Sequence, residues 1–244
     1  MREIIIAPSL LAADPAELGA EVRRAETAGA DWLHLDIMDG HFVPNLSFGP
    51  AIVAAVRRCT RLPLDVHLML SRPDQYIDAF ARAGASTITV HVDADHDVAA
   101  SLRKIRQLGC RRGLALNPDT QIEQTRPFLG EIDLLLAMTV HPGFGGQSLI
   151  PAVLDKCRVA AELRHSLSHQ FDIEVDGGVG LENAPACAAA GANVLVAGTA
   201  LYTPGDMGER IRRMRQEAAR ALSSGSRGQA PAGQATGTRH SAPR

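Results

Sequence analysis

The stretch Leu33-His34-Leu35-Asp36-Ile37-Met38-Asp39-Gly40 alternates like a buried strand, yet one of its two faces is polar. In an extended strand, His34 and Asp36 point to one face, and the apolar residues at 33, 35 and 37 point to the other. If the first face lines the inside of a closed sheet, an imidazole and a carboxylate are buried two residues apart. Each then requires a partner, which is the other side chain, a cation or a ligand.

Helical patterns alternate with apolar, β-branched runs along most of the chain. Several junctions carry a glycine typical of a helix C-terminus that leads into a strand, as at Gly29, Gly84 and Gly191. The predicted strands are residues 3–8, 31–36, 62–67, 86–91, 111–116, 132–139, 170–175 and 193–197. Such a series of eight strand-helix units indicates an α/β protein with the (β/α)8 TIM-barrel fold, whose active site lies at the C-terminal strand ends. A doubly wound sheet is the alternative, but its Gly-x-Gly-x-x-Gly motif is missing after the first strand.

The domain organisation follows from a change in composition near Ser223. From there to Arg244 the chain has no apolar periodicity and no acidic residue. We therefore predict one catalytic barrel domain over residues 1–222 and a disordered C-terminal tail over residues 223–244.

The overall composition limits the classes of partner. The chain has 244 residues, 45% of them hydrophobic, so it can bury a large core. A formal net charge of −2 gives no electrostatic footprint for nucleic acid or an anionic membrane. The N-terminus lacks the pattern of a signal peptide, and no segment resembles a membrane span. Because the four cysteines match neither a zinc ribbon nor a disulfide framework, we expect reduced thiols in a cytoplasmic protein.

Polar residues gather at the predicted C-terminal ends of the strands, where a packing layer would be apolar. For His91 or His141 taken singly, a hydrogen-bonded structural histidine is the favoured interpretation. The set as a whole is too polar for that interpretation. It comprises Ser9, His34, Asp36, His67, His91, Asn117, His141, Asp176, Gly198 and Thr199.

Four of these residues form a candidate metal site. His34, Asp36, His67 and Asp176 come from the second, third and seventh predicted strands, whose ends meet at one mouth of a barrel. Two imidazoles and two carboxylates suit one divalent ion of zinc, manganese, iron or cobalt. Two hydrogen-bonded His–Asp pairs without a metal are the alternative.

Glycines after the last three strands point to a phosphate group. Pro142-Gly143-Phe144-Gly145-Gly146-Gln147 follows the sixth strand, Gly177-Gly178 the seventh, and Gly198-Thr199 the eighth. Barrels commonly bind phosphate through backbone N–H groups in this region, and glycine permits a close approach. Ordinary turn formation is the alternative. Schiff-base chemistry is disfavoured, because the only lysines, Lys104 and Lys156, lie within helical patterns.

Several motifs together resemble the ribulose-phosphate 3-epimerase family over about residues 3–220. They are Ala7-Pro8-Ser9-Leu10-Leu11-Ala12-Ala13-Asp14, His34-Leu35-Asp36-Ile37-Met38-Asp39-Gly40-His41-Phe42-Val43-Pro44-Asn45, Asp65-Val66-His67-Leu68-Met69, Pro142-Gly143-Phe144-Gly145-Gly146-Gln147 and Glu174-Val175-Asp176-Gly177-Gly178. The resemblance implies a metal-dependent isomerase that interconverts D-ribulose 5-phosphate and D-xylulose 5-phosphate in the pentose phosphate pathway of carbohydrate metabolism.

The resemblance also implies roles for particular residues. His34, Asp36, His67 and Asp176 would hold the metal, and Asp36 and Asp176 would be the catalytic acid/base pair. Inverting a carbon next to a ketone requires a proton to leave one face and another to arrive at the opposite face, which two flanking carboxyl groups achieve. The metal would stabilise the enediolate as a Lewis acid. Asp36 would be the base toward the ribulose epimer and Asp176 the acid.

The same resemblance predicts the remaining substrate contacts. Met38, Met69 and Met138 would form a polarizable wall over the reacting carbons, although core filling is an equal alternative for Met138. Ser9, His67 and Asp176 would touch the sugar. The phosphate would lie against Gly143, Phe144, Gly145, Gly146, Gly177, Gly178, Gly198 and Thr199.

The sequence departs from the family pattern at three places. His141 stands where asparagine is usual, Thr199 replaces serine, and residues 93–97 lack a common glutamate. Two other functions stay open, namely 3-epimerisation of a ketohexose 6-phosphate and binding of a sugar phosphate without catalysis. We further expect a homo-oligomer, and we expect Asp39 to shape a turn rather than join the site.

Overall fold

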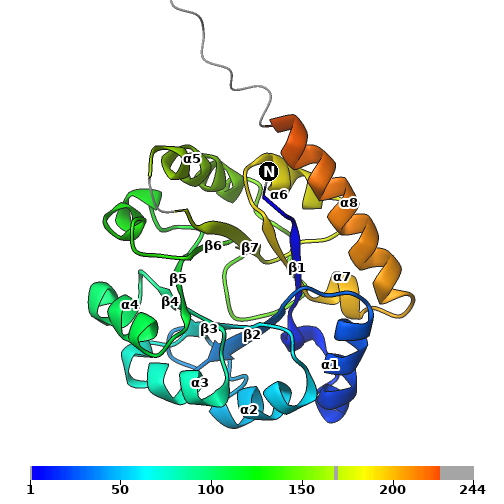
Figure 1. Cartoon of the computed structure of the whole chain (residues 1–244), viewed down its shortest axis with the longest axis horizontal. Coiled ribbons are helices and arrows are strands. Elements are labelled where there is room, and N and C mark those ends of the chain that lie inside the picture. The colour runs from blue at the N-terminus through cyan, green and yellow to red at the C-terminus, as the bar shows by residue number, and fades with distance from the viewer. Residues whose placement is uncertain (1, 168–169, 226–244) are drawn as a thin grey trace, which may run out of the picture.

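The computed structural model describes residues 2–167 and 170–225, and it shows a ring of parallel strands surrounded by helices (Figure 1). Each strand from β2 to β8 pairs with its sequence neighbour, and β1 pairs with β8. A parallel bridge between Ser9 and His34 joins β1 to β2 and closes the ring. The strands are β1 Ile5–Pro8, β2 Leu33–Met38, β3 Leu64–Met69, β4 Thr87–His91, β5 Arg111–Leu116, β6 Leu134–Met138, β7 Asp172–Asp176 and β8 Val194–Ala197. The predicted single-domain (β/α)8 barrel is therefore confirmed.

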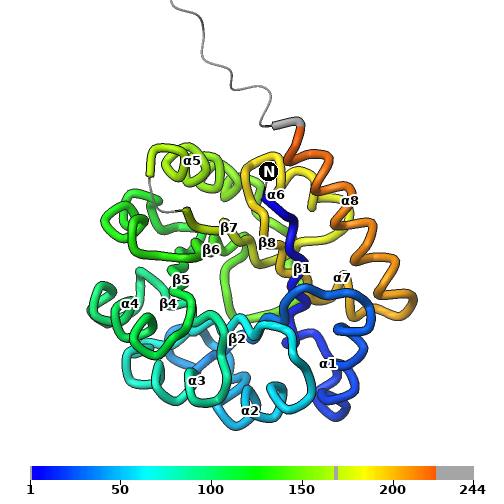
Figure 2. The backbone as a smooth tube through the Cα atoms, in the orientation of Figure 1, coloured from blue at the N-terminus to red at the C-terminus, as the bar shows by residue number. Residues whose placement is uncertain are grey.

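The helices form an outer layer around the strands, and the chain path can be followed in Figure 2. The α-helices are α1 Leu18–Thr27, α2 Pro50–Cys59, α3 Ile77–Ala83, α4 Val98–Gln107, α5 Val153–Ser166, α6 Ala184–Ala189, α7 Thr199–Tyr202 and α8 Met207–Gly225. Short 3-10 segments are η1 Leu10–Ala12, η2 Pro15–Glu17, η3 Pro73–Gln75 and η4 Ile122–Phe128, the last of which connects β5 to β6.

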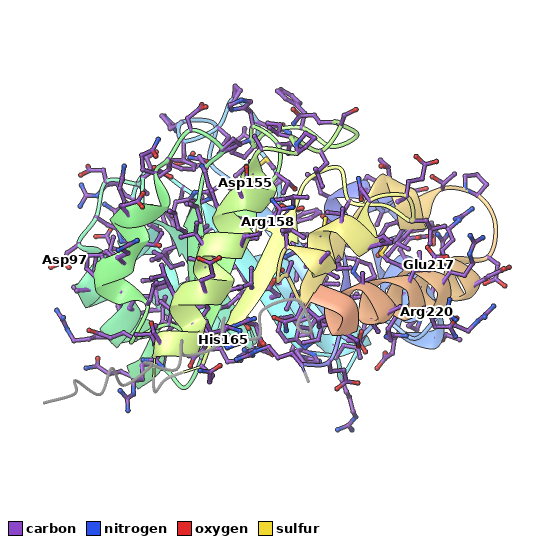
Figure 3. All side chains as sticks on the ribbon, turned by 90° about the horizontal axis from the view of Figure 1, so that it is seen from above. Asp97, Asp155, Arg158, His165, Glu217 and Arg220 are labelled. Atoms are coloured by element: carbon purple, nitrogen blue, oxygen red, sulfur yellow. The ribbon has the colours of Figure 1, made fainter. Side chains whose placement is uncertain are left out.

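Local sequence signals explain where several of these helices begin and end. The Asp97 carboxylate accepts a hydrogen bond from the backbone N of Ala100 (2.9 Å) and so caps the start of α4. Gly84 ends α3 in the left-handed conformation (φ 103°), where a Cβ would lie 2.7 Å from the Cγ of Arg57. Charged side chains cover the outer helices, as Figure 3 shows for Asp155 and Arg158 on α5.

The period of two in β2 separates two different environments. Leu33, Leu35 and Ile37 are buried in the apolar layer between barrel and helices. His34 and Asp36 are also buried, but they face the barrel interior. A separate apolar cluster contains Ala7, Trp32, Leu134, Val194 and Val196. The alternation in β2 therefore places apolar side chains toward the helices and polar side chains toward the barrel interior.

Some element boundaries differ from the predicted ones. β2 and β3 each continue two residues beyond Asp36 and His67, because Met38 and Met69 still pair with each other. The last helix reaches Gly225, three residues past the predicted barrel boundary, and residues 226–244 of the predicted tail lie outside the described residues.

Two further features of the chain are the state of its cysteines and the apolar character of its helices. The four cysteines are free thiols, as predicted, and they are Cys59, Cys110, Cys157 and Cys187. Within residues 2–167 and 170–225, no helix has the length and apolar character to span a lipid bilayer.

Candidate active site

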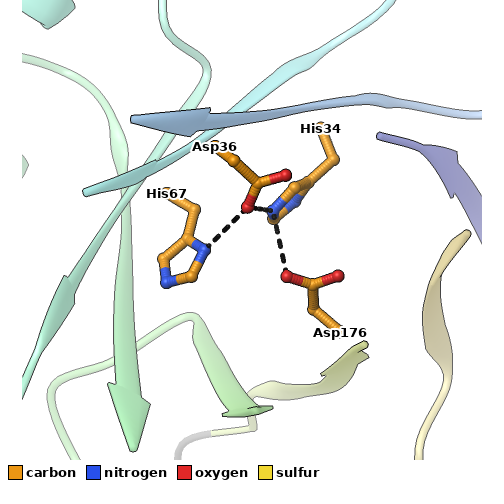
Figure 4. Close-up of side chains that lie close together, drawn as sticks. All are labelled: His34, Asp36, His67 and Asp176. Atoms are coloured by element: carbon orange, nitrogen blue, oxygen red, sulfur yellow. Dashed lines mark hydrogen bonds and ion pairs between the residues drawn. The ribbon is translucent and has the colours of Figure 1, made fainter. Parts of the chain in front are cut away.

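Four side chains from three strands converge at the C-terminal mouth of the barrel (Figure 4). His34 Nε2 and His67 Nδ1 each lie 3.2 Å from Asp36 Oδ1, and His34 Nε2 lies 3.9 Å from Asp176 Oδ2. One potential ligand atom from each residue lies within 4.8 Å of the others. Both imidazoles are fully buried, so these groups are removed from water and depend on one another or on a bound ion.

The donor set of this His/Asp cluster fits a divalent metal ion. Two imidazole nitrogens and two carboxylate oxygens point to one place, which is a common ligand combination for first-row metals. The metal-free alternative of two separate pairs fits less well, because both histidines contact the same oxygen of Asp36. Asp176 is left 3.9 Å from the nearest imidazole nitrogen, beyond hydrogen-bonding distance.

Two buried carboxyl groups that the sequence analysis did not assign lie one layer below. Asp65 Oδ2 accepts a hydrogen bond from His34 Nδ1 (2.7 Å), and Glu174 Oε1 lies 3.5 Å from the same nitrogen. A period-two signal pointed to both residues, because Asp65 precedes His67 by two positions and Glu174 precedes Asp176 by two. The contact with Asp65 orients the His34 ring so that Nε2 faces the site.

The two carboxyl groups of the site have opposite shifts in pKa. Burial alone would raise the pKa of Asp36, but the positive charge of His34 and hydrogen bonds from both histidines hold it well below its usual range. The pKa of Asp176 rises to about 7, because of burial and the negative charge of Asp36. Without a bound metal, one group is therefore a carboxylate and the other keeps a proton to near neutral pH.

The histidines are likewise unequal. Burial would lower the pKa of His34, but the negative charges of Asp36 and Asp65 raise it well above the usual value. Burial dominates at His67 and lowers its pKa. Two hydroxyl groups hold Asp36 in place, since Ser9 donates to its Oδ2 (2.6 Å) and Ser47 donates to its backbone carbonyl.

A pocket opens above the four converging side chains, and most predicted substrate residues line it. Leu11, Ala12, Val140, Gln147, Val179 and Val196 also belong to the wall, although the sequence analysis did not assign them. His67 does not line the pocket, because β3 continues to Met69, which takes the position facing the opening. The predicted residues that do line it are Ser9, Asp36, Met38, Met69, Met138, Gly143, Phe144, Gly145, Gly146, Asp176, Gly177, Gly178, Gly198 and Thr199.

The glycines around this pocket serve two purposes. A Cβ at Gly178 would lie 2.3 Å from the backbone N of Leu149, and one at Gly177 would lie 2.4 Å from a methyl group of Val140. Both glycines also have positive φ, so the β7 loop requires them in order to pack against the β6 loop. At Gly145 and Gly146, by contrast, no described atom beyond the adjacent residues lies within 4 Å of such a Cβ, although Gly146 also has positive φ. The backbone there is open to a ligand.

Polar side chains hold the glycine-rich loop 142–146 in position. Asn45 Nδ2 donates to the carbonyl of Gly143 (2.7 Å), which joins the loops after β2 and β6. Gln147 Nε2 donates to the carbonyls of His141 (2.8 Å) and Phe144 (2.9 Å). The loop that faces the pocket is therefore supported at both of its ends.

The two histidines that sequence analysis interpreted as structural differ from each other. His91 is fully buried, and its Nε2 lies 2.8 Å from Nε2 of His67. The expectation is wrong for His141, whose side chain is 63% exposed and lies 3.6 Å from Asp119 through Nδ1, too far for a hydrogen bond. β6 ends before this residue, so the imidazole turns outward from the loop.

Asp39 shapes a turn, as predicted, and also connects two strands. Its Oδ1 accepts hydrogen bonds from the backbone N of His41 and of Phe42 (both 2.8 Å). Its Oδ2 accepts from the backbone N (2.8 Å) and the hydroxyl (2.7 Å) of Ser71, just after β3. Burial would raise its pKa, but the Ser71 donors lower it to about 2. Asp39 thereby fixes the spacing between the ends of β2 and β3.

A (β/α)8 barrel with a His/Asp cluster at the base of a glycine-lined pocket defines this chain as a TIM barrel whose C-terminal mouth carries a candidate site for a divalent metal. The Ribulose-phosphate 3 epimerase family matches residues 5–202. The chain belongs to this family.

Named relatives agree with this assignment over nearly their whole length. The Ribulose-phosphate 3-epimerase of Bacillus subtilis (strain 168) is 47% identical over 213 residues, which cover 87% of this chain and 98% of the relative. That of Escherichia coli (strain K12) is 44% identical over 224 residues, covering 90% and 98%. The crystal structure of KGPDC from Streptococcus mutans superposes with a TM-score of 0.67 at 14% identity, covering 90% of this chain and 99% of that one. This last similarity concerns the fold alone.

Proposed function

We propose that this protein is a metal-dependent ribulose-phosphate 3-epimerase, which converts D-ribulose 5-phosphate to D-xylulose 5-phosphate by two-carboxylate proton transfer. The placement of Asp36 and Asp176 on β2 and β7, lining one pocket beside two buried histidines, carries this proposal. The names of relatives that are 44 to 47% identical support it.

The two carboxyl groups divide the proton transfer between them. Asp36, whose low pKa keeps it ionised, removes the proton from C3 of the ribulose epimer. Asp176, whose pKa of about 7 leaves it protonated near neutrality, delivers a proton to the opposite face. In the reverse direction the roles exchange. Ser9 holds the Asp36 carboxylate through a 2.6 Å hydrogen bond, so the base approaches the substrate with a defined oxygen.

The residues of the His/Asp cluster would hold one divalent ion of zinc, manganese, iron or cobalt. When bound, such an ion supplies Lewis-acid stabilisation of the negative charge that develops on the substrate oxygens. His34 and His67 would offer nitrogen ligands from beneath the pocket, and Asp36 and Asp176 would offer oxygens from its wall.

The rest of the pocket binds and shields the sugar phosphate. Met38 and Met69 pack together with Val43 and form an apolar wall that limits access of water to the reacting carbon. The phosphate lies against the open backbone at Gly145 and Gly146 and against Gly198 and Thr199 at the start of α7. Backbone N–H groups there donate hydrogen bonds to the phosphate oxygens.

The cellular setting is also part of the proposal. Four free thiols suit the reducing cytoplasm. Leu46, 74% exposed on the loop after β2, and the exposed Tyr76 offer apolar surface for contact between copies in a homo-oligomer.

A coupled assay with D-ribulose 5-phosphate, with and without chelator, tests the reaction and the metal together. We expect activity that chelator removes and a divalent ion restores. A ketohexose 6-phosphate in the same assay tests the related substrate class, and faster turnover of the hexose would contradict the pentose assignment. Full activity after verified metal removal would contradict the metal-dependent mechanism.

Running the reaction in deuterium oxide distinguishes the roles of the two carboxyl groups. In Asp176→Asn, Asp36 can still remove and return a proton on one face, so the C3 hydrogen of ribulose 5-phosphate should exchange with solvent while epimerisation falls by about 100-fold to 10,000-fold. In Asp36→Asn both exchange and epimerisation from ribulose should fall. Asp95→Asn makes the same chemical change at a side chain that is 85% exposed, and it should behave as wild type. Normal epimerisation by a folded, metal-loaded Asp176→Asn variant would refute the proposal.

A further inference from the structure

Behind the metal-ligand candidate His67 lies a second buried imidazole, His91. The two Nε2 atoms are 2.8 Å apart, and both rings are fully buried. Phe42 packs against His91 with a centroid distance of 4.8 Å. Two imidazole nitrogens at this separation share one proton, because one nitrogen must donate and the other must accept.

The other nitrogen of His67 decides the direction of that hydrogen bond. Nδ1 of His67 faces the His/Asp cluster, 3.2 Å from Asp36 Oδ1. When Nδ1 serves as a metal ligand it carries no proton, so the proton of the neutral ring is on Nε2. His67 then donates to His91 Nε2, and the proton of His91 is on its own Nδ1.

Asp93 is the group that faces this second proton. His91 Nδ1 lies 3.7 Å from Asp93 Oδ2, and among the described residues it has no hydrogen-bond partner. Asp93 itself is anchored by Asn117, whose Nδ2 donates to its Oδ2 (3.1 Å), and by the hydroxyl of Thr120. A fixed carboxylate at this distance attracts an Nδ1–H group and repels a bare Nδ1 lone pair.

The other candidate histidine ligand, His34, has a similar arrangement in which a carboxylate contacts the imidazole without an intervening residue. His34 Nδ1 meets Asp65 Oδ2 directly at 2.7 Å. Nε2 of His67 contacts no carboxylate directly, because His91 stands between this nitrogen and Asp93. Each histidine of the His/Asp cluster is thus linked to a carboxylate: His34 contacts Asp65 directly, and His67 is connected to Asp93 through His91.

We propose that His91 and Asp93 are positioning residues for the metal site: Asp93 selects the Nδ1–H tautomer of His91, and His91 thereby holds His67 with Nδ1 free for the ion. This inference rests on the proposed metal-dependent function. Without metal, His67 Nδ1–H donates to Asp36 and His91 Nε2–H donates to His67. An ion held at His67 Nδ1 would displace the proton there to solvent; the shared proton would then lie on His67 Nε2, and His91 Nδ1 would take up a proton from solvent, so the number of protons on the pair would not change.

Nitrogen-15 NMR of histidine-labelled protein, with and without zinc at constant neutral pH, reads these tautomers. We expect His91 to change from the Nε2–H to the Nδ1–H form when zinc is added to wild type. The His91→Gln spectrum identifies the resonances. The Nε2–H form of His91 in the zinc-loaded protein would overturn the inference.

Competition with a chelator measures zinc affinity in the same proteins. We expect His91→Gln to bind zinc about 10-fold to 100-fold more weakly than wild type, and Asp93→Asn to be weakened by a smaller factor. Asp95→Asn, two residues further along the same loop, carries the same charge change at an exposed position and should match wild type. Thermal unfolding of the metal-free proteins establishes whether each variant is folded. If His91→Gln does not fold, the affinity of Asp93→Asn alone tests the inference.

The outcomes distinguish this inference from the proposed function. If wild type binds zinc and both variants bind it equally well, His91 and Asp93 are structural and only the inference fails. If wild type binds no divalent ion, the metal-dependent function fails and the inference fails with it.

Discussion

Replacing Asp176 with asparagine should stabilise the metal-free protein even though it removes the carboxyl group that we propose as the catalytic acid. The side chain of Asp176 is 14% exposed, and its pKa rises from 3.8 to about 7 because of desolvation and the negative charge of Asp36. As pH rises, the unfolded chain releases this proton near pH 4, whereas the folded chain keeps it until about pH 7. Rising pH across this window therefore favours the unfolded state.

The size of the change in stability follows from the shift in the pKa of Asp176. A tenfold change in proton affinity corresponds to about 1.4 kcal/mol, so a rise from 3.8 to about 7 corresponds to about 4 kcal/mol once the pH exceeds both values. Asp176→Asn keeps the size of the side chain and removes the charge. The variant should be more stable than wild type by about 4 kcal/mol near pH 8 and by about 2 kcal/mol near pH 5.

Urea unfolding with chelator present, followed by circular dichroism at both pH values, measures this difference. The exposed Asp95→Asn should change stability by less than about 0.5 kcal/mol at either pH. Adding zinc should reverse the order, because wild type binds the ion more tightly than the variant. The reasoning is refuted if metal-free Asp176→Asn is less stable than wild type near pH 8, or if its gain is the same at both pH values.

Three further perturbations test other parts of the structure. Gly113→Ala should destabilise the fold by about 3 kcal/mol or more in urea unfolding, since the new Cβ would lie 2.0 Å from Oγ1 and 2.9 Å from the backbone Cα of Thr89 inside the barrel; an unchanged midpoint would contradict this. Asp65→Asn removes the charge that orients His34 and should weaken zinc binding by about 10-fold to 100-fold in chelator competition, and wild-type affinity would show that the contact is unimportant. Gln147→Ala should raise KM for the sugar phosphate with little change in kcat or in melting temperature, because it releases the glycine-rich loop and not the proton-transfer groups; a loss confined to kcat would point to another role.

Much of the cluster could be predicted because it depends on local periodicity and chain order. Alternation in β2 placed His34 and Asp36 on one face, and the parallel order of the strands brought the β2, β3 and β7 ends to one mouth. His67 and Asp176 therefore converge with them, as the sequence analysis expected. The expected contact of His67 with substrate stays a prediction; His67 is absent from the pocket wall, where Met69, two residues further along β3, takes its place.

The glycines show that a sequence pattern can identify a residue as part of the site without revealing why glycine is required there. The sequence indicated glycine-rich loops beside a phosphate, and these loops do line the pocket. Gly178, however, is constrained by the Leu149 backbone 2.3 Å from its absent Cβ, a contact between two loops that no local pattern contains.

The sequence by itself determined the barrel, the polar face of β2 and the identity of four converging side chains, since strand periodicity and strand-helix alternation are written in consecutive residues. Only the tertiary structure decided which nitrogen of each histidine faces the pocket, that Asp176 lies near Asp36 and so keeps its proton, and that His91 stands behind His67 while His141 turns to solvent. These contacts join different strands and loops, and the relative depth of their side chains is set by the stagger and tilt of the closed barrel.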